Sequence, residues 1–133
     1  MRDYLSLQMR TQDISEISSL GLAHLGDAVY DLLVRSWLCE NGSVTSQRLH
    51  NETVRRVNSA AQAKSLEKIR HMLTEEEEAV YKRGRNAKMP ARAGSRATAA
   101  QRHTATGLES LFGWLYLRGD RERLNELFAA IME

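Results

Sequence analysis

Two acidic residues lie in apolar stretches of the sequence, each with a glycine close by. Asp27 directly follows Gly26 in the run Leu-Gly-Asp-Ala-Val, and Glu109 begins the run Glu-Ser-Leu-Phe-Gly that ends at Gly113. Glycine inside a helix costs about 1 kcal/mol relative to alanine, and an unpaired buried carboxylate is also unfavourable. Carboxylate oxygens are the ligands that divalent cations such as Mg²⁺ prefer, and helical cores can present them from two helices. The pattern suggests a metal site.

Each acid also has a purely structural interpretation. Asp27 could pair with Arg35 or cap a neighbouring helix, and Glu109 could pair with Arg102 at modest benefit. His24, one turn before Asp27, could touch a substrate or orient water, although packing is the more common role of such a histidine. The residue types alone leave these interpretations open.

A dense basic segment runs from Lys82 to Arg102. It holds seven of the 19 basic residues and no acidic one, so the rest of the chain carries a net charge of −5 although the whole carries +2. One basic segment on an acidic body is typical of a surface that meets phosphates, and a solvated loop is the alternative. Asn86, within it, could bond a sugar or phosphate or serve as a turn residue. The basic residues are Lys82, Arg83, Arg85, Lys88, Arg92, Arg96 and Arg102.

Composition narrows the class of protein. The chain has 133 residues, 42% of them hydrophobic and 27% charged, which fits one domain with its own core. Cys39 is the only cysteine, so an internal disulfide and a cysteine-based metal cluster are excluded. No apolar run approaches the roughly 20 residues that cross a bilayer, and the first residues do not resemble a secretory signal. We expect a cytoplasmic protein without a membrane partner.

Helix formers dominate the sequence, and strand-like alternation is absent, so we expect an all-α fold. The first helix should begin near Asp13 or Ser15 and end at residue 40; it is apolar nearly all round, which is typical of a central helix. A second helical region spans about 46–72 and could break at Asn58. Thr74 opens a third helix with a capping box, and a loop at about 86–98 follows. A helix over about 98–117 that stops at Gly119 and a last helix capped by Asp120 complete the chain.

Two motifs resemble those of the ribonuclease III family. Residues 25–30, Leu-Gly-Asp-Ala-Val-Tyr, are similar to its signature helix, and residues 109–113, Glu-Ser-Leu-Phe-Gly, are similar to its second acidic motif. Residues 74–80, Thr-Glu-Glu-Glu-Glu-Ala-Val, followed by 82–88, Lys-Arg-Gly-Arg-Asn-Ala-Lys, resemble the Mini-ribonuclease III branch, which lacks an appended double-stranded RNA-binding domain. The resemblance covers about residues 14–132 and implies a single helical endonuclease domain, 1–133.

This resemblance implies a Mg²⁺-dependent endoribonuclease that cleaves double-stranded RNA and leaves 5′-phosphates. Asp27 and Glu109 would be both the catalytic residues and the metal ligands. Two further positions that are usually acidic in the family are Ala23 and Thr106 here, so the number of metal ions stays open. Water or substrate oxygens would complete the coordination shell.

The resemblance also implies partners. One site cuts one strand, so cutting both strands implies a homodimer that joins across the signature helices. The substrate by analogy is a stem in the precursor of large-subunit (23S) ribosomal RNA, and the need for an accessory ribosomal protein is left open. The expected RNA contacts are the seven basic residues together with Asn86. The alternative function is a module of the same fold that binds structured RNA without cutting it.

Overall fold

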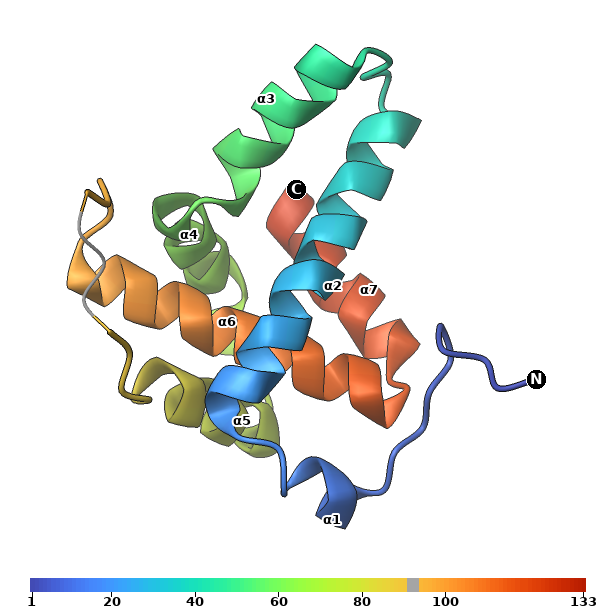
Figure 1. The fold of residues 1–133 in the computed structure, drawn as a ribbon, viewed down its shortest axis with the longest axis vertical. Coiled ribbons are helices and arrows are strands. Elements are labelled where there is room, and N and C mark those ends of the chain that lie inside the picture. Colours follow the sequence, from blue (N-terminus) through green and yellow to red (C-terminus); the bar gives the residue numbers. More distant parts are fainter. Residues whose placement is uncertain (91–93) are drawn as a thin grey trace.

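The computed structural model describes residues 1–90 and 94–133, and these residues form helices and no strand. The expected all-α fold is confirmed. A 3₁₀ helix at Arg70–Met72 lies between the fourth and fifth α-helices. The α-helices are α1 (Thr11–Ile14), α2 (Ser19–Glu40), α3 (Ser46–Val57), α4 (Ser59–Ile69), α5 (Glu75–Arg85), α6 (Ala99–Arg118) and α7 (Arg121–Met132) (Figure 1).

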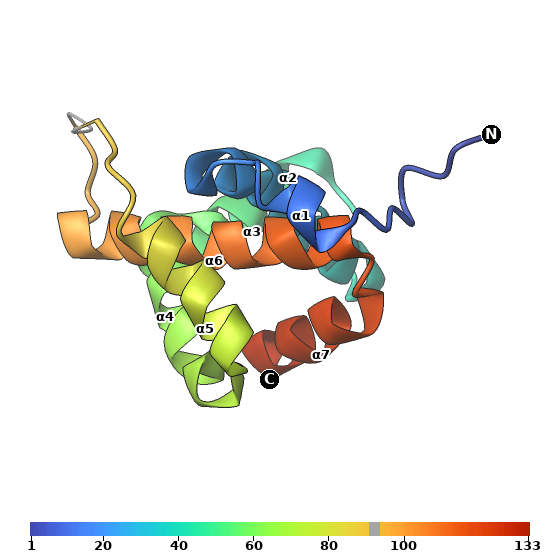
Figure 2. The ribbon, with the colours of Figure 1, turned by 90° about the horizontal axis from the view of Figure 1, so that it is seen from below.

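The central helix is α6, which packs against α2, α4, α5 and α7 (Figures 1 and 2). Eleven of its 20 residues are buried. The sequence predicted that the first long helix would be central, and this is wrong. Helix α2 crosses α6 but leaves Leu20 and Leu32 exposed, so it is not buried on most of its sides. An all-round apolar pattern does not distinguish a helix covered by its own chain from one with an uncovered face.

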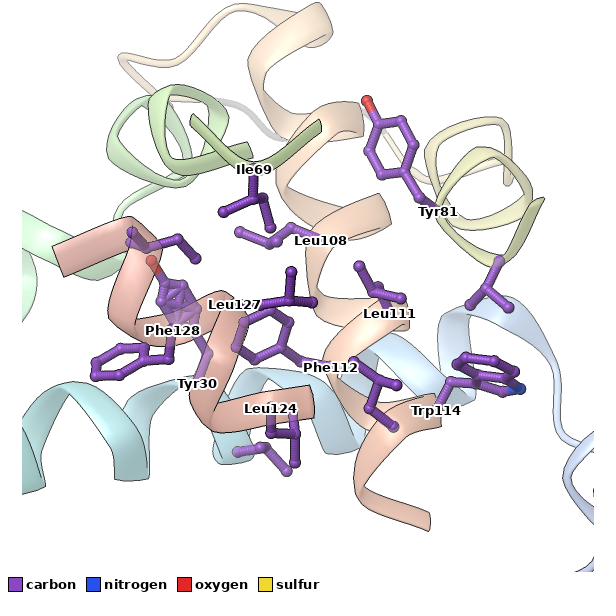
Figure 3. Packing of buried hydrophobic residues seen from close by; sticks show 14 of the residues in the cluster. Tyr30, Ile69, Tyr81, Leu108, Leu111, Phe112, Trp114, Leu124, Leu127 and Phe128 are labelled. Atoms are coloured by element: carbon purple, nitrogen blue, oxygen red, sulfur yellow. The ribbon is translucent and has the colours of Figure 1, made fainter. Parts of the chain in front are cut away.

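Aromatic and aliphatic side chains from α2, α6 and α7 form the middle of the core (Figure 3). Tyr30 of α2 stacks on Phe112 of α6 with ring centroids 5.3 Å apart, and meets Phe128 of α7 edge-on at 6.2 Å. Leu108 and Leu111 of α6 are fully buried beside them. This packing fixes the relative positions of α2 and α6, the two helices that carry the acidic motifs.

The helix ends confirm several predicted boundaries. Asn58 separates α3 from α4: its side chain accepts from the Ala61 amide and donates to the Val54 carbonyl. Thr74 caps α5 in a capping box, and Gly119 ends α6 in the left-handed conformation at φ +77°. Asp120 then caps α7, as predicted.

The start of the first long helix differs from the prediction. The chain makes the short helix α1, which ends at Ile14, and α2 begins only after Ser18, whose hydroxyl accepts a hydrogen bond from the Gly21 amide. Ser18 is extended, at φ −64° and ψ 157°, so one continuous helix from residue 13 or 15 is wrong. Residues 86–90 and 94–98 are non-helical, as predicted, and project from the ends of α5 and α6 (Figure 2).

Candidate functional site

Helices α2 and α6 cross with their backbones in contact at two glycines. A Cβ atom on Gly26 would lie 1.6 Å from the carbonyl oxygen of Glu109, and one on Gly113 would lie 2.2 Å from the carbonyl oxygen of Leu22. No side chain fits between the helices at either point. The crossing therefore fixes the neighbouring residues Asp27 and Glu109 beside each other, as the pairing of acid and glycine in the sequence suggested.

The two acids line one cavity. Its volume is about 1000 Å³, and its lining comes from α2, α3, α4, α6 and the segments at 89–90 and 95–97. Asp27 is exposed, whereas Glu109 is half-buried at the inner wall. The geometry thus brings together the two residues that the sequence singled out, although they are 82 positions apart.

The electrostatics of this cavity are unfavourable for two negative charges. Burial, the hydrogen bond with Asp27 and the negative charge of Asp27 together raise the pKa of Glu109 to about 8. Burial and the charge of Asp27 also raise the pKa of Asp31, one turn further along α2. A cation between these groups would remove the repulsion that burial strengthens.

Arg35 and Arg102, the arginines suggested as structural partners of Asp27 and Glu109, bind other groups. Arg35 pairs with Asp31, with 3.5 Å between Nη2 and Oδ2, and the Nη1 of Arg102 donates to the Ala97 carbonyl at 2.7 Å. His24 is exposed on α2, and its role in substrate contact stays a prediction.

A glutamine that the sequence analysis missed completes the inner wall. Gln62 of α4 lines the same cavity with 1% of its surface exposed, and its Nε2 lies 3.5 Å from Oε2 of Glu109. The signal was its position one turn before Leu66 on the buried face of α4, where a polar side chain is unusual.

The donor set fits Mg²⁺. The two carboxylates are hard oxygen ligands, and Mg²⁺ commonly uses one or two carboxylates and keeps several waters. Among residues 1–90 and 94–133, no group of three or more His, Cys, Asp and Glu residues could hold a metal, which agrees with the acids missing at Ala23 and Thr106. Thr106 instead donates its hydroxyl hydrogen to the Arg102 carbonyl.

The predicted RNA contacts fall into separate groups. Arg96 and Arg102 lie at the rim of the cavity that holds the acids. A neighbouring groove, where α5 meets the start of α2, is lined by Lys82, Arg83 and Asn86.

The other predicted contacts have their own environments. Arg85 stacks over Tyr81, with its guanidinium 5.5 Å from the ring, and Lys88 is exposed. Arg92 lies outside the described residues.

In the part of the chain that the structure covers, no helix is both long and apolar enough to span a bilayer.

Comparison with known proteins gives consistent matches. The family model described as Ribonuclease III domain matches residues 20–120. A Mini-ribonuclease 3 of Symbiobacterium thermophilum is 43% identical over 92% of this chain and 93% of its own length. One from Enterococcus faecalis is 41% identical over 87% of this chain and 89% of its own length.

A solved structure has a similar fold. The crystal structure of a protein from Fusobacterium nucleatum matches with a TM-score of 0.79 and 29% sequence identity. The match covers 90% of this chain and 95% of that one.

Proposed function

Because this chain belongs to the Mini-ribonuclease 3 group of the ribonuclease III family and is thus an endoribonuclease, we propose that it cuts double-stranded RNA with a Mg²⁺ ion held by Asp27 and Glu109. The observation that carries the proposal is that both carboxylates line one open cavity with arginines at its rim. Among residues 1–90 and 94–133, neither acid forms the ion pair with a basic side chain that is typical of a structural carboxylate.

The residues of the chain have separate tasks in this mechanism. Asp27 and Glu109 would hold the ion. A bound Mg²⁺ supplies a Lewis acid for that phosphate and makes a coordinated water more acidic. Glu109 must lose its proton to bind a cation, so the affinity for Mg²⁺ should rise with pH up to about 8. The products would carry 5′-phosphates and 3′-hydroxyls.

The basic residues would hold the duplex. Arg96 and Arg102 lie close enough to the acids to bind phosphates near the cut, and Lys82, Arg83 and Asn86 extend this surface along α5. Double-stranded RNA is recognised mainly through phosphates and 2′-hydroxyls, which suits side chains that carry donors and positive charge. Arg85 and Lys88 belong to the same proposed surface, and Arg92, outside the described residues, stays a predicted contact.

A homodimer would place two such sites on one duplex. Its support is the uncovered apolar surface of α2, where Leu32 is 56% exposed beside a groove of about 470 Å³ that Leu5, Val29 and Leu124 also line. We propose further that the substrate is a stem in the 23S ribosomal RNA precursor, on the basis of the family resemblance, with a ribosomal protein as a candidate accessory partner.

The test is cleavage of an end-labelled RNA duplex with Mg²⁺ or with EDTA. Asp27→Asn and Glu109→Gln should each lower the rate by more than about 100-fold. Loss of a residue that hydrogen-bonds a metal ligand typically costs about 10- to 100-fold, and loss of the ligand itself should cost more. Both variants should still bind RNA in EDTA. Glu76→Gln is the control, since Glu76 is an exposed acid that pairs with Arg118 on another face. Binding without cleavage by the natural sequence would instead support the non-cleaving module.

A further inference from the structure

Gln62 of α4 has a buried polar atom that lacks a hydrogen-bond partner in the part of the chain that the structure describes. Its Nε2 donates to the Val57 carbonyl at 3.1 Å and lies 3.5 Å from Oε2 of Glu109. Its Oε1 is buried and has no hydrogen-bond partner among the described residues. Buried acceptors are almost always paired, so this oxygen requires an explanation.

The chemistry of its neighbours fixes which way the amide points. The Val57 carbonyl, to which Nε2 donates, can only accept hydrogen bonds, and Glu109 also only accepts once it has lost its proton to bind a cation. An amide turned by 180° would place Oε1 against both acceptors and leave two donors unpaired. The nitrogen must therefore face Glu109, and the oxygen stays without a partner among residues 1–90 and 94–133.

Packing alone does not account for a glutamine at this position. Leu66 and Ile69 continue the same buried face of α4, and an apolar residue of similar volume would avoid the unpaired oxygen. The side chain lines the cavity that holds Asp27 and Glu109, so the polar group is retained where a ligand would enter.

We propose that Gln62 is a positioning residue of the metal site, orienting Glu109 through Nε2 and accepting at Oε1 a hydrogen bond from a water of the bound Mg²⁺. This inference rests on the proposed function. A cation held by two carboxylates keeps several waters, and such waters are strong donors that need acceptors around them. Asp27 and Glu109 supply some, and Gln62 supplies a neutral one that adds no further repulsion between acids.

The test compares Gln62→Met with Ser65→Ala, a matched control one turn along α4. Ser65 bonds Tyr30 and the Ala61 carbonyl and does not line the cavity, so its loss perturbs α4 without touching Glu109. Calorimetric titration with MgCl₂ in the absence of RNA should show an affinity about 10-fold weaker for Gln62→Met and unchanged for Ser65→Ala. Gln62→Leu serves as a second apolar variant, because both Leu and Met are good helix formers.

A positioning role also predicts different results for RNA binding and for RNA cleavage. RNA binding in EDTA should stay at the natural level in Gln62→Met, whereas cleavage should recover when Mg²⁺ is raised by about the factor lost in affinity. If both apolar variants bind Mg²⁺ as tightly as the natural sequence, the role of Gln62 is wrong while the proposed function stands. If the natural sequence itself binds no Mg²⁺, the proposed function fails, and this inference with it.

Discussion

Two partly or fully buried glutamates of this protein have opposite surroundings. Glu77 of α5 is 4% exposed and bonds Arg123 of α7, with 2.8 Å from Oε2 to Nε and 2.9 Å from Oε1 to Nη2. Burial opposes its charge, yet the hydrogen bond from Arg123 lowers the pKa of Glu77 below its usual value. Glu109 of α6 has the acid Asp27 where Glu77 has an arginine, and its pKa is raised.

The difference separates a structural carboxylate from a functional one. Glu77 completes the capping box of α5 and ties that helix to α7, so its charge is used within the fold. The negative charge of Asp27 opposes ionisation of Glu109, and either a proton on Glu109 or a cation bound between the two acids would relieve this repulsion. The same residue type thus serves stability in one place and ligand binding in the other.

The largest expected effect comes from separating Asp27 from Glu109. Gly26→Ala places a methyl group against the Glu109 backbone, so α2 and α6 must move apart at a cost of about 3 kcal/mol or more. Thermal unfolding and duplex cleavage should both show the loss. Gly21→Ala is the control: its Cβ would meet only the side chains of Ile17 and Ser18, at 3.0 and 3.1 Å, and stability should change by less than about 1 kcal/mol. Equal effects of the two changes would contradict the role of the crossing.

Exchanging each glutamate for glutamine should give opposite results. Glu77→Gln leaves Arg123 without its main partner and should lower the free energy of unfolding by about 3 kcal/mol. Glu109→Gln removes the repulsion from Asp27 and should leave the metal-free protein at least as stable as the natural one, although cleavage is lost. Denaturant unfolding in EDTA measures both. A marked destabilisation by Glu109→Gln would show that its charge stabilises the fold.

The pH dependence of stability should distinguish the same pair. The raised pKa of Glu109 means that the folded state holds a proton that the unfolded state releases above its ordinary value of 4.5. Metal-free stability should therefore fall as pH rises from about 4.5 to 8, and Glu109→Gln or saturating Mg²⁺ should remove that fall.

Glu77 contributes in the other direction. Its lowered pKa gives stability that is present above its unfolded pKa and is lost as pH falls through the folded value. Glu77→Gln should therefore reduce the loss of stability in acid and leave the change between pH 4.5 and 8 intact. If the stability of Glu77→Gln and of Glu109→Gln depended on pH in the same way, the contrast between the two glutamates would be wrong.

The sequence predicted those features that depend on local chemistry. The capping box of Thr74, the break at Asn58 and the stop at Gly119 follow from backbone groups within a few residues, and the structure confirms them. An acid beside a glycine in an apolar run suggested a metal site and left structural roles open, and the resemblance to the ribonuclease III family then assigned Asp27 and Glu109 to one site. The structure places both on one cavity.

Features that depend on tertiary packing were not predictable in this way. The central position of α6 depends on which helices cover which faces, and apolar content does not encode that. Gln62 carries no motif, and only its place on the buried face of α4 links it to Glu109. The separation of the basic residues into two grooves likewise depends on how α5 packs beside the start of α2.

The smallest expected effect concerns the rim rather than the acids. Arg83 and Arg96 are exposed and lie in different grooves, so replacing both with alanine should remove about two phosphate contacts. Each lost contact should flatten the slope of log affinity against log salt by about 1, while Mg²⁺ affinity stays unchanged because no ligand is altered. Binding is measured in EDTA so that the duplex is not cut. Arg10→Ala, which removes the partner of Asp13 in α1, should leave the slope as it is. An unchanged slope in the double variant would mean that the duplex is held elsewhere, and the rim arginines would then have no part in bringing RNA to Glu109.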